Sequence, residues 1–148
     1  MTVIDRSALL PHSAERLYDL VADIEAYPQF LNGCVGSEIL ARSEATVTAR
    51  LSLSRAGFSQ SFVTENVMTP HKQIELTLID GPFDKFAGRW NFTALAPDAC
   101  KVSLSLAFTL RSGLIGAAAG RLFDRVALDL VDAVVARAEV IYGKKGSV

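Results

Sequence analysis

The chain has 148 residues, of which 50% are hydrophobic and 21% are charged, with a formal net charge of −1 at pH 7. This composition predicts one globular domain, long enough to bury a core without disulfide staples, and it excludes an intrinsically disordered chain. The near-neutral charge balance gives no support to nucleic-acid binding driven by overall charge, and no DNA partner is expected, although a local basic patch stays open.

The N-terminal residues predict one strand followed by two short helical segments. Residues 3–10 have the composition of a strand. Ser13 is a candidate N-cap for a helix. The apolar positions of that helix follow the i, i+3, i+4, i+7 rule: Leu17, Leu20, Val21 and Ile24. Pro28 disfavours helical geometry at Tyr27, so this helix should stop or bend there before a second short turn.

From residue 34 to residue 110 apolar and polar residues alternate with a period of two, which predicts about six consecutive strands. The turns between them are indicated by Ala56-Gly57, Thr69-Pro70-His71, Asp80-Gly81-Pro82 and Ala96-Pro97-Asp98. Phe86, Trp90 and Phe92 share one strand face. Consecutive strands with tight turns predict an antiparallel meander with one apolar and one polar face.

Residues 113–142 predict one long helix, with Ser112 as the candidate N-cap and Gly143 where the helix stops. Its charged residues fall in a stripe roughly 80° wide. They are Arg121, Arg125, Asp129, Asp132 and Glu139. Most of the remaining circumference is apolar, which is more than a flat layer can cover. The sequence therefore predicts an α+β domain over residues 1–148, in which a strongly curved antiparallel sheet of about seven strands wraps the last helix.

A curved sheet that grips one helix rarely closes completely, so a cavity is expected between them. We expect apolar side chains from the sheet, the helix and the segment around Tyr27 to line it. The candidate ligand-binding residues are Tyr27, Phe30, Phe62, Leu76, Leu78, Phe83, Trp90, Phe92, Leu104, Leu106, Phe108, Leu122 and Val126.

Two motifs stand out along the chain. The first runs from Val21 to Leu31, with the sequence VADIEAYPQFL, and is followed by Cys34. The second is Asp80-Gly81-Pro82-Phe83, followed by Phe86, Gly88, Trp90 and Phe92. Together with the order of elements, they resemble the START-like superfamily, also described as polyketide cyclase/dehydrase-like and lipid-transport proteins. The resemblance is strongest to the branch that contains the coenzyme Q-binding proteins and the RatA proteins.

The chain departs from the pattern of this branch at two turns. Asn32-Gly33 stands where a proline and a bulky residue are usual, and Asp84 precedes Lys85 where lysine usually follows Gly-Pro-Phe directly. The resemblance implies the helix-grip fold, in which a sheet wraps one long helix. These two departures leave the expected fold unchanged. They do call into question any partner contact that the family makes through these two turns.

Two non-enzymatic functions are implied by the resemblance. The first is binding of ubiquinone or a related isoprenoid quinone or lipid in the cavity, as a carrier or chaperone that supports respiration. This function involves no covalent cofactor and is compatible with transient contact with a membrane. The second is RatA-type association with the large ribosomal subunit, which blocks subunit joining and makes the protein a toxin. A cyclase/aromatase enzyme is a third reading, disfavoured because no acid–base constellation is visible.

The ribosomal alternative depends on basic residues. The candidates are Arg50, Arg55, Lys72, Lys85, Arg89, Lys101, Lys144 and Lys145. Several other residues have two interpretations. Tyr27 and Phe30 either gate the cavity or fill core, and Phe83 either belongs to a turn or projects towards a ligand or partner. Trp90 is either core or cavity wall, and Gly88 indicates a bulge or a close backbone approach.

Polar and small residues in the last helix also have two interpretations. Asp124 and Arg137 interrupt its apolar arc, and either point a polar group into the cavity or, as we prefer, reach its rim. The spacing of Gly116 and Gly120 indicates either a mobile entrance to the cavity or close packing against a strand.

The remaining signals are mainly negative. Cys34 and Cys100 have no metal-site spacing and are expected to be buried reduced thiols, with a disulfide left open. His12 and His71 are expected to be exposed turn residues, and no catalytic or metal-binding residue is expected. Neither a signal peptide nor an apolar run of ~18 residues is recognisable. We therefore expect a cytoplasmic protein, with a peripheral inner-membrane location as an alternative.

Overall fold

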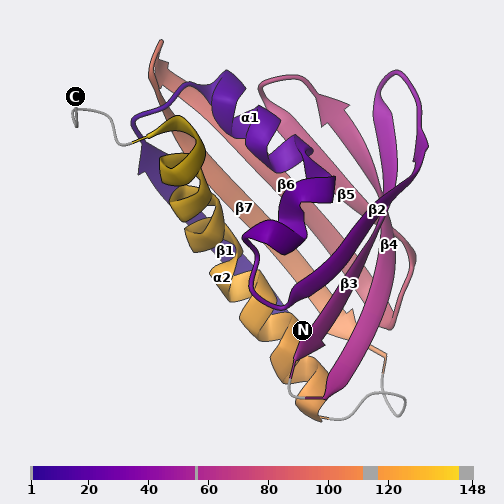
Figure 1. Cartoon of the computed structure of the whole chain (residues 1–148). Helices are drawn as coiled ribbons and strands as arrows, with labels where there is room; N and C mark the ends of the chain where they lie inside the picture. Colours follow the sequence, from indigo (N-terminus) through magenta and orange to yellow (C-terminus); the bar gives the residue numbers. More distant parts are fainter. Residues whose placement is uncertain (1, 56, 112–116, 144–148) are drawn as a thin grey trace.

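A strongly curved antiparallel sheet packs one of its faces against a long helix, α2 (Figure 1). The computed structural model describes residues 2–55, 57–111 and 117–143. The seven strands have the order β1-β7-β6-β5-β4-β3-β2, and all neighbouring strands are antiparallel. Their bounds are β1 (Thr2–Leu10), β2 (Cys34–Arg42), β3 (Thr46–Arg55), β4 (Phe58–Thr69), β5 (Gln73–Asp80), β6 (Phe83–Ala96) and β7 (Ala99–Leu110). The predicted helix-grip architecture is confirmed.

Irregular pairing accompanies the curvature of the sheet. The register between β6 and β7 shifts between Phe83 and Lys85, and β2 has two shifts against β3. A bulge adds one residue to one strand, which bends that strand and changes which side chains face inward. As a result Phe83 and Phe86, three positions apart, approach each other with ring centroids 5.2 Å apart.

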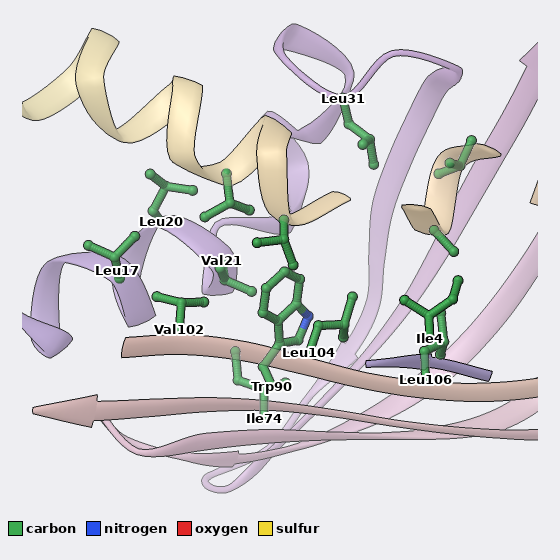
Figure 2. Close-up of a cluster of buried hydrophobic side chains, with 14 of the residues drawn as sticks. Ile4, Leu17, Leu20, Val21, Leu31, Ile74, Trp90, Val102, Leu104 and Leu106 are labelled. Carbon is green, nitrogen blue, oxygen red and sulfur yellow. The ribbon is translucent and has the colours of Figure 1, made fainter. Parts of the chain in front are cut away.

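Two short helical segments lie between β1 and β2, as predicted, but the first ends at Ala22 and not at Tyr27, which belongs to the second segment. Helix α1 (Ala14–Ala22) begins where the Ser13 side chain accepts a hydrogen bond of 3.1 Å from the backbone N–H of Arg16. The 3-10 helix η1 (Ile24–Gln29) follows and contains Pro28. Figure 2 shows Val21 of α1 beside the ring of Trp90, which is buried, and Leu20 on the side of α1 that faces α2. This layer closes the α1 end of the space between the sheet and α2.

Helix α2 (Ala117–Tyr142) carries the predicted charged stripe. Four of its five members, Arg121, Arg125, Asp132 and Glu139, are exposed, and the carboxylate of the fifth, Asp129, lies 3.6 Å from the Arg125 guanidinium. The helix ends at Gly143, as predicted, where the backbone has φ 79° and the N–H donates to the carbonyl of Glu139. The expected start, residues 112–116, lies outside the described residues.

Covering of α2 is incomplete at its last turn. Val140 and Ile141 are exposed, with 75% and 49% of their surface accessible. We expected the sheet to cover the apolar surface of this helix. It covers the part that faces the cavity, but the expectation is wrong for the final turn. None of the described helices has the length and apolarity needed to cross a membrane.

The cysteines and histidines differ in how well they match expectation. Cys34 and Cys100 are both free and buried, which confirms the reduced thiols. His71 is exposed in a turn with φ 63°. The prediction of an exposed His12 is wrong, because only 4% of its surface is accessible. Tyr142, the last residue of α2, packs its ring 5.7 Å from the His12 ring and covers it.

Candidate ligand-binding cavity

A cavity of about 100 Å³ lies between the sheet, the α1–η1 segment and α2. Its volume is smaller than the engineered apolar cavity of about 150 Å³ that binds benzene in another protein. A single ring or a short branched chain is therefore the largest group that it can enclose without rearrangement. Figure 2 shows Trp90, Leu104 and Leu106 on the sheet side of this region, opposite Val21 and Leu31.

Most of the predicted ligand-binding residues line this cavity. They are Tyr27, Phe62, Leu76, Phe83, Trp90, Leu104, Leu106, Phe108 and Val126. They come from η1, four strands and α2, so distant parts of the chain meet here. Sequence reasoning missed other lining residues, most of them apolar. These include Val21, Ile24, Leu31, Ala49, Leu51, Leu53, Met68, Ile74, Phe86, Phe123, Ala127 and Leu130.

Phe92 and Leu122 lie outside the lining, contrary to the prediction. Phe92 points inward, but its ring stacks on Trp90 at 6.3 Å and meets the ring of Tyr18 at 5.7 Å, so it is covered by α1. Leu122 is buried in the core. Successive residues of a helix point about 100° apart, so Leu122 and Phe123 face different directions. Phe123 lines the cavity and Leu122 does not.

Phe30 and Leu78 also lie outside the lining. Phe30 packs edge-on against Tyr27 and lies under the Arg137 guanidinium, 5.4 Å from the ring centroid. Leu78 lies beside the turn between β5 and β6, where its Cδ1 would be 3.3 Å from a Cβ atom on Gly81. Both side chains are half-buried supports of the wall.

Aromatic rings close one end of the cavity. Phe83 is central, with its ring centroid 4.9 Å from Phe123 of α2 and 5.6 Å from Phe108 of β7. Phe62 of β4 approaches both Phe83 and Phe123 at 5.8–5.9 Å. Phe83 therefore belongs to the wall, and it does not project outward from its turn. Gly81 permits this packing, because a Cβ atom there would lie 2.8 Å from Cβ of Phe62.

Tyr27 forms part of the wall at η1. Its hydroxyl donates a hydrogen bond to the carbonyl oxygen of Val21. Burial raises the pKa of Tyr27 well above its usual range, and the nearby Cys34 and Asp23 raise it further. The side chain is therefore neutral at physiological pH, with its proton directed to the backbone of α1.

Two buried polar side chains face the cavity from β4, and sequence reasoning missed both. Thr64 and Asn66 are 7% and 6% exposed, and the Thr64 hydroxyl donates a hydrogen bond of 2.7 Å to Oδ1 of Asn66. Both lie among the lining residues. The signal was present in the sequence, because these residues alternate with outward positions and share the inward face of β4 with Phe62 and Met68.

The polar residues of α2 lie at the rim, as we preferred. Asp124 accepts a hydrogen bond of 3.2 Å from Thr2, and Arg137 donates one of 3.0 Å to the Gln29 side chain. Neither lines the cavity. Gly120 lies where a Cβ atom would meet Leu110 of β7 at 3.5 Å, whereas Gly116 is outside the described residues. The mobile entrance stays a prediction.

Ionisable groups are scarce around the cavity. Among the described residues that line the cavity, Tyr27 is the one ionisable side chain, and its raised pKa keeps it neutral; no carboxylate, imidazole or amine is among them. No group of three or more histidine, cysteine or acidic side chains positioned for a metal ion occurs in the described ranges. Burial also raises the pKa of the Cys100 thiol to about 11.

The basic candidates are spread over the surface of the sheet. Arg50 is ion-paired with Glu38, and Arg89 lies 3.8 Å from Glu75. The other described candidates, Lys72, Lys85 and Lys101, are exposed. The Arg55 side chain and residues 144–145 lie outside the part of the chain whose side chains are described.

Comparisons with known proteins agree with this geometry. The sequence profile of the family described as polyketide cyclase / dehydrase and lipid transport matches residues 10–135. The chain is 43% identical over 145 residues to the ribosome association toxin RatA of Escherichia coli (strain K12), which covers 98% of this chain and 92% of that protein. It is 29% identical to the mitochondrial coenzyme Q-binding protein COQ10 homolog B of Xenopus laevis, over 94% of this chain and 59% of that protein.

Among solved structures, the chain is similar to the Zhui aromatase/cyclase from Streptomyces sp. R1128. The TM-score is 0.83 and the match covers 99% of each chain, with 17% sequence identity. At this identity the similarity concerns the fold alone. The resemblance to the START-like superfamily that the two sequence motifs indicated is confirmed.

Proposed function

The chain belongs to the polyketide cyclase / dehydrase and lipid transport family, and from this membership we propose that it associates with the ribosome in the manner of the RatA proteins. The observation that carries the proposal is the 43% identity to a ribosome association toxin over 98% of the chain. The identity to the coenzyme Q-binding relative is 29%, and that match spans 59% of the relative. Ribosome association therefore replaces quinone transport as the first functional candidate.

The outer face of the sheet is the surface that we assign to this contact. The inner face is covered by α1, η1 and α2, so it is not open to a large partner. On β6 and β7 the residues Lys85, Arg89 and Lys101 are exposed, and Arg89 and Lys101 each stand between two buried neighbours. Lys101 pairs with Thr93, so the three cations recur every four strand positions.

This spacing suits contact with a nucleic-acid backbone. Four strand residues span roughly 13 Å, so the row of cations extends over roughly 26 Å. Exposed cations of this kind contact phosphates and give a salt-dependent affinity without base specificity. The low net charge is compatible with this role, because the proposed contact is local and does not depend on the field of the whole molecule.

Sedimentation with separated ribosomal subunits tests the proposal. We expect the purified protein to co-sediment with large subunits at physiological salt and to stay in the supernatant with small subunits. The variant K85E/R89E/K101E should bind at least tenfold more weakly, whereas Arg42→Glu on β2 is a control at the opposite edge of the sheet. Failure to co-sediment with large subunits at both low and physiological salt would contradict the proposal.

A second candidate function is binding of an apolar ligand in the cavity. The observation that favours it is the continuous apolar lining of a space of about 100 Å³. The volume accommodates about one unsubstituted ring, so the ring substituents and the isoprenoid tail of a quinone would have to extend beyond the enclosed space. Delivery of such a ligand would require transient contact with a membrane.

Organic extraction of the purified protein followed by mass spectrometry tests the second candidate. We expect a co-purifying quinone or lipid, and a saturable change in the emission of Trp90, the single tryptophan, when a short-tail ubiquinone is added. The absence of both a bound lipid and a saturable response would exclude this function. It would leave ribosome association untouched, because the outer face of the sheet carries that contact.

We propose that both functions are binding functions and that the protein is not an enzyme. Acid–base catalysis needs a group whose pKa lies near the working pH. The polar groups of the described lining are a tyrosine with a raised pKa, one threonine, one asparagine and the indole N–H of Trp90, and none of them has a pKa near neutrality. Incubation with a linear polyketide mimic that remains unchanged would agree with this assignment, and its cyclisation would overturn it.

A further inference from the structure

Thr64 and Asn66 form an isolated polar pair in the apolar floor of the cavity. The pairing register places Asn66 between Val47 of β3 and Leu76 of β5. Thr64 lies between Ala49 and Leu78 in the same way. An amide placed among hydrocarbon side chains is costly unless its hydrogen-bonding groups are paired. This pair must therefore have compensating partners or a functional reason to be there.

The protein provides part of the compensation. A side-chain amide has two N–H donors and one acceptor oxygen, and a threonine hydroxyl has one donor. The bond between the pair uses the Thr64 proton and one lone pair of Asn66 Oδ1. Within the described residues no protein group accepts a hydrogen bond from the Asn66 amide nitrogen. The two N–H groups thus stay available at the cavity wall.

The hydroxyl of Thr64 also orients the amide. Because it donates to Oδ1, the oxygen of Asn66 is turned towards Thr64, and the nitrogen is the atom left for a ligand. The cavity volume limits that ligand to about one ring. No lining side chain among those described carries a charge at neutral pH, so a charged ligand would lose its hydration without compensation.

We propose that Asn66 binds the carbonyl oxygen of a neutral, ring-sized apolar ligand, and that Thr64 is the positioning residue that holds the amide for it. This inference rests on the second candidate function, binding of an apolar ligand in the cavity, and it adds the chemical class and the point of recognition. The carbonyl oxygen accepts from Asn66 while the remainder of the ligand contacts hydrocarbon.

Two probes of nearly identical shape isolate this hydrogen bond. Cyclopentanone has a carbonyl group where methylenecyclopentane has a C=CH₂ group. In an NMR titration of the wild-type protein, cyclopentanone should move an Asn66 side-chain N–H signal downfield and saturate. Methylenecyclopentane should perturb the methyl signals of Leu76 and Val126 and leave the Asn66 amide protons in place. This arm needs no variant, so it does not depend on a mutant that folds.

The variant arm compares dissociation constants. The hydrocarbon leaves water for an apolar cavity more readily than the ketone does, whatever the protein. The informative quantity is therefore the ratio of the dissociation constant of cyclopentanone to that of methylenecyclopentane, compared between proteins. Asn66→Leu should shift this ratio against cyclopentanone by about fivefold to tenfold, as expected for one hydrogen bond. Asn91→Leu, on the outer face of β6, should leave the ratio unchanged. Thr64→Val should produce a smaller shift in the same direction as Asn66→Leu.

The outcomes separate the inference from the function on which it rests. If both probes bind but the ketone leaves the Asn66 amide protons unmoved, or if Asn66→Leu leaves the ratio unchanged, the carbonyl assignment is wrong and apolar binding stands. If neither probe perturbs the cavity methyl groups and extraction yields no lipid, both the assignment and the second candidate function are wrong.

Discussion

The ring of Phe83, on β6, lies 4.9 Å from the ring of Phe123, on α2, measured between centroids. This contact joins the Gly-Pro-Phe motif to the helix that the sheet wraps. It therefore explains the motif by packing: the turn delivers an aromatic ring to the cavity wall, where three further phenylalanine rings lie within 6 Å of it.

Removal of this ring should be among the most destabilising single changes in the sheet. Phe83→Ala should lower the free energy of unfolding by ~3–5 kcal/mol, because it removes a buried ring and leaves a void among other rings. Phe83→Leu should cost less than Phe83→Ala, because it retains most of the apolar volume while losing the ring contacts. Urea denaturation measures both. A loss below ~1 kcal/mol for Phe83→Ala would indicate that the ring does not contribute to the core.

Gly88 is expected to tolerate no side chain without repacking of the cavity floor. A Cβ atom there would lie 3.0 Å from Cδ1 of both Leu76 and Leu106, on the two flanking strands. Gly88→Ala should therefore cost ~1–3 kcal/mol. Ala87→Ser, on the exposed face of the same strand, should stay within ~0.5 kcal/mol of the wild type. Equal stability of the two variants would contradict the close approach.

Tyr27 should make stability sensitive to alkaline pH. Burial raises its pKa in the folded state above the value of about 10 in an unfolded chain. Its contribution to stability is therefore complete below pH ~10 and is lost as the pH rises through the folded-state pKa. Tyr27→Phe removes both this dependence and the bond to Val21, which should cost ~1 kcal/mol at pH 7.

The measurement for Tyr27 is a pair of urea denaturation series at several pH values. The advantage of the wild type over Tyr27→Phe should be constant from pH 7 to pH 9 and should shrink above pH 10. A difference that stays constant up to pH 11.5, or one that grows, would show that the hydroxyl is not held in its neutral form by the fold.

The Arg137 guanidinium over the Phe30 ring should contribute a measurable coupling. The charged carbon lies 5.4 Å from the ring centroid, and the side chain also donates to Gln29. A double-mutant cycle of Arg137→Met and Phe30→Leu should give a coupling of ~0.5–1 kcal/mol. Replacing Arg137→Met by Arg125→Met, on the exposed stripe, should give additive effects. Additivity in the first cycle would show that the stacking carries no energy.

Local patterns were sufficient to predict the elements of this fold. Alternation with a period of two defined the strands, and Ser13 and Gly143 marked the start of the first helix and the end of the last, because their caps depend on near neighbours. Pro28 indicated a second helical segment but not its boundary, because it lies inside the 3-10 helix. The wide apolar arc of the last helix then required a curved sheet around it. These signals are local, and tertiary packing did not override them.

The composition of the site was harder to predict, because alternation shows which face a residue occupies and not what lies above it. Phe92 shares the inward face with Trp90, yet α1 covers Phe92 while the cavity lies beside Trp90. His12 is buried by Tyr142, 130 residues later, which no local pattern indicates. Thr64 and Asn66 were detectable as polar residues at inward positions of a strand, and they were missed because polar candidates were sought only on the last helix.

A titration of fluorescently labelled protein with purified large ribosomal subunits tests the central claim most directly. At physiological salt, and with an excess of small subunits present as competitor, the anisotropy should rise to saturation. K85E/R89E/K101E should bind at least tenfold more weakly, with a reduced dependence on salt. The absence of saturable binding by the wild type, or equal competition by small subunits, would contradict ribosome association as the function of this chain.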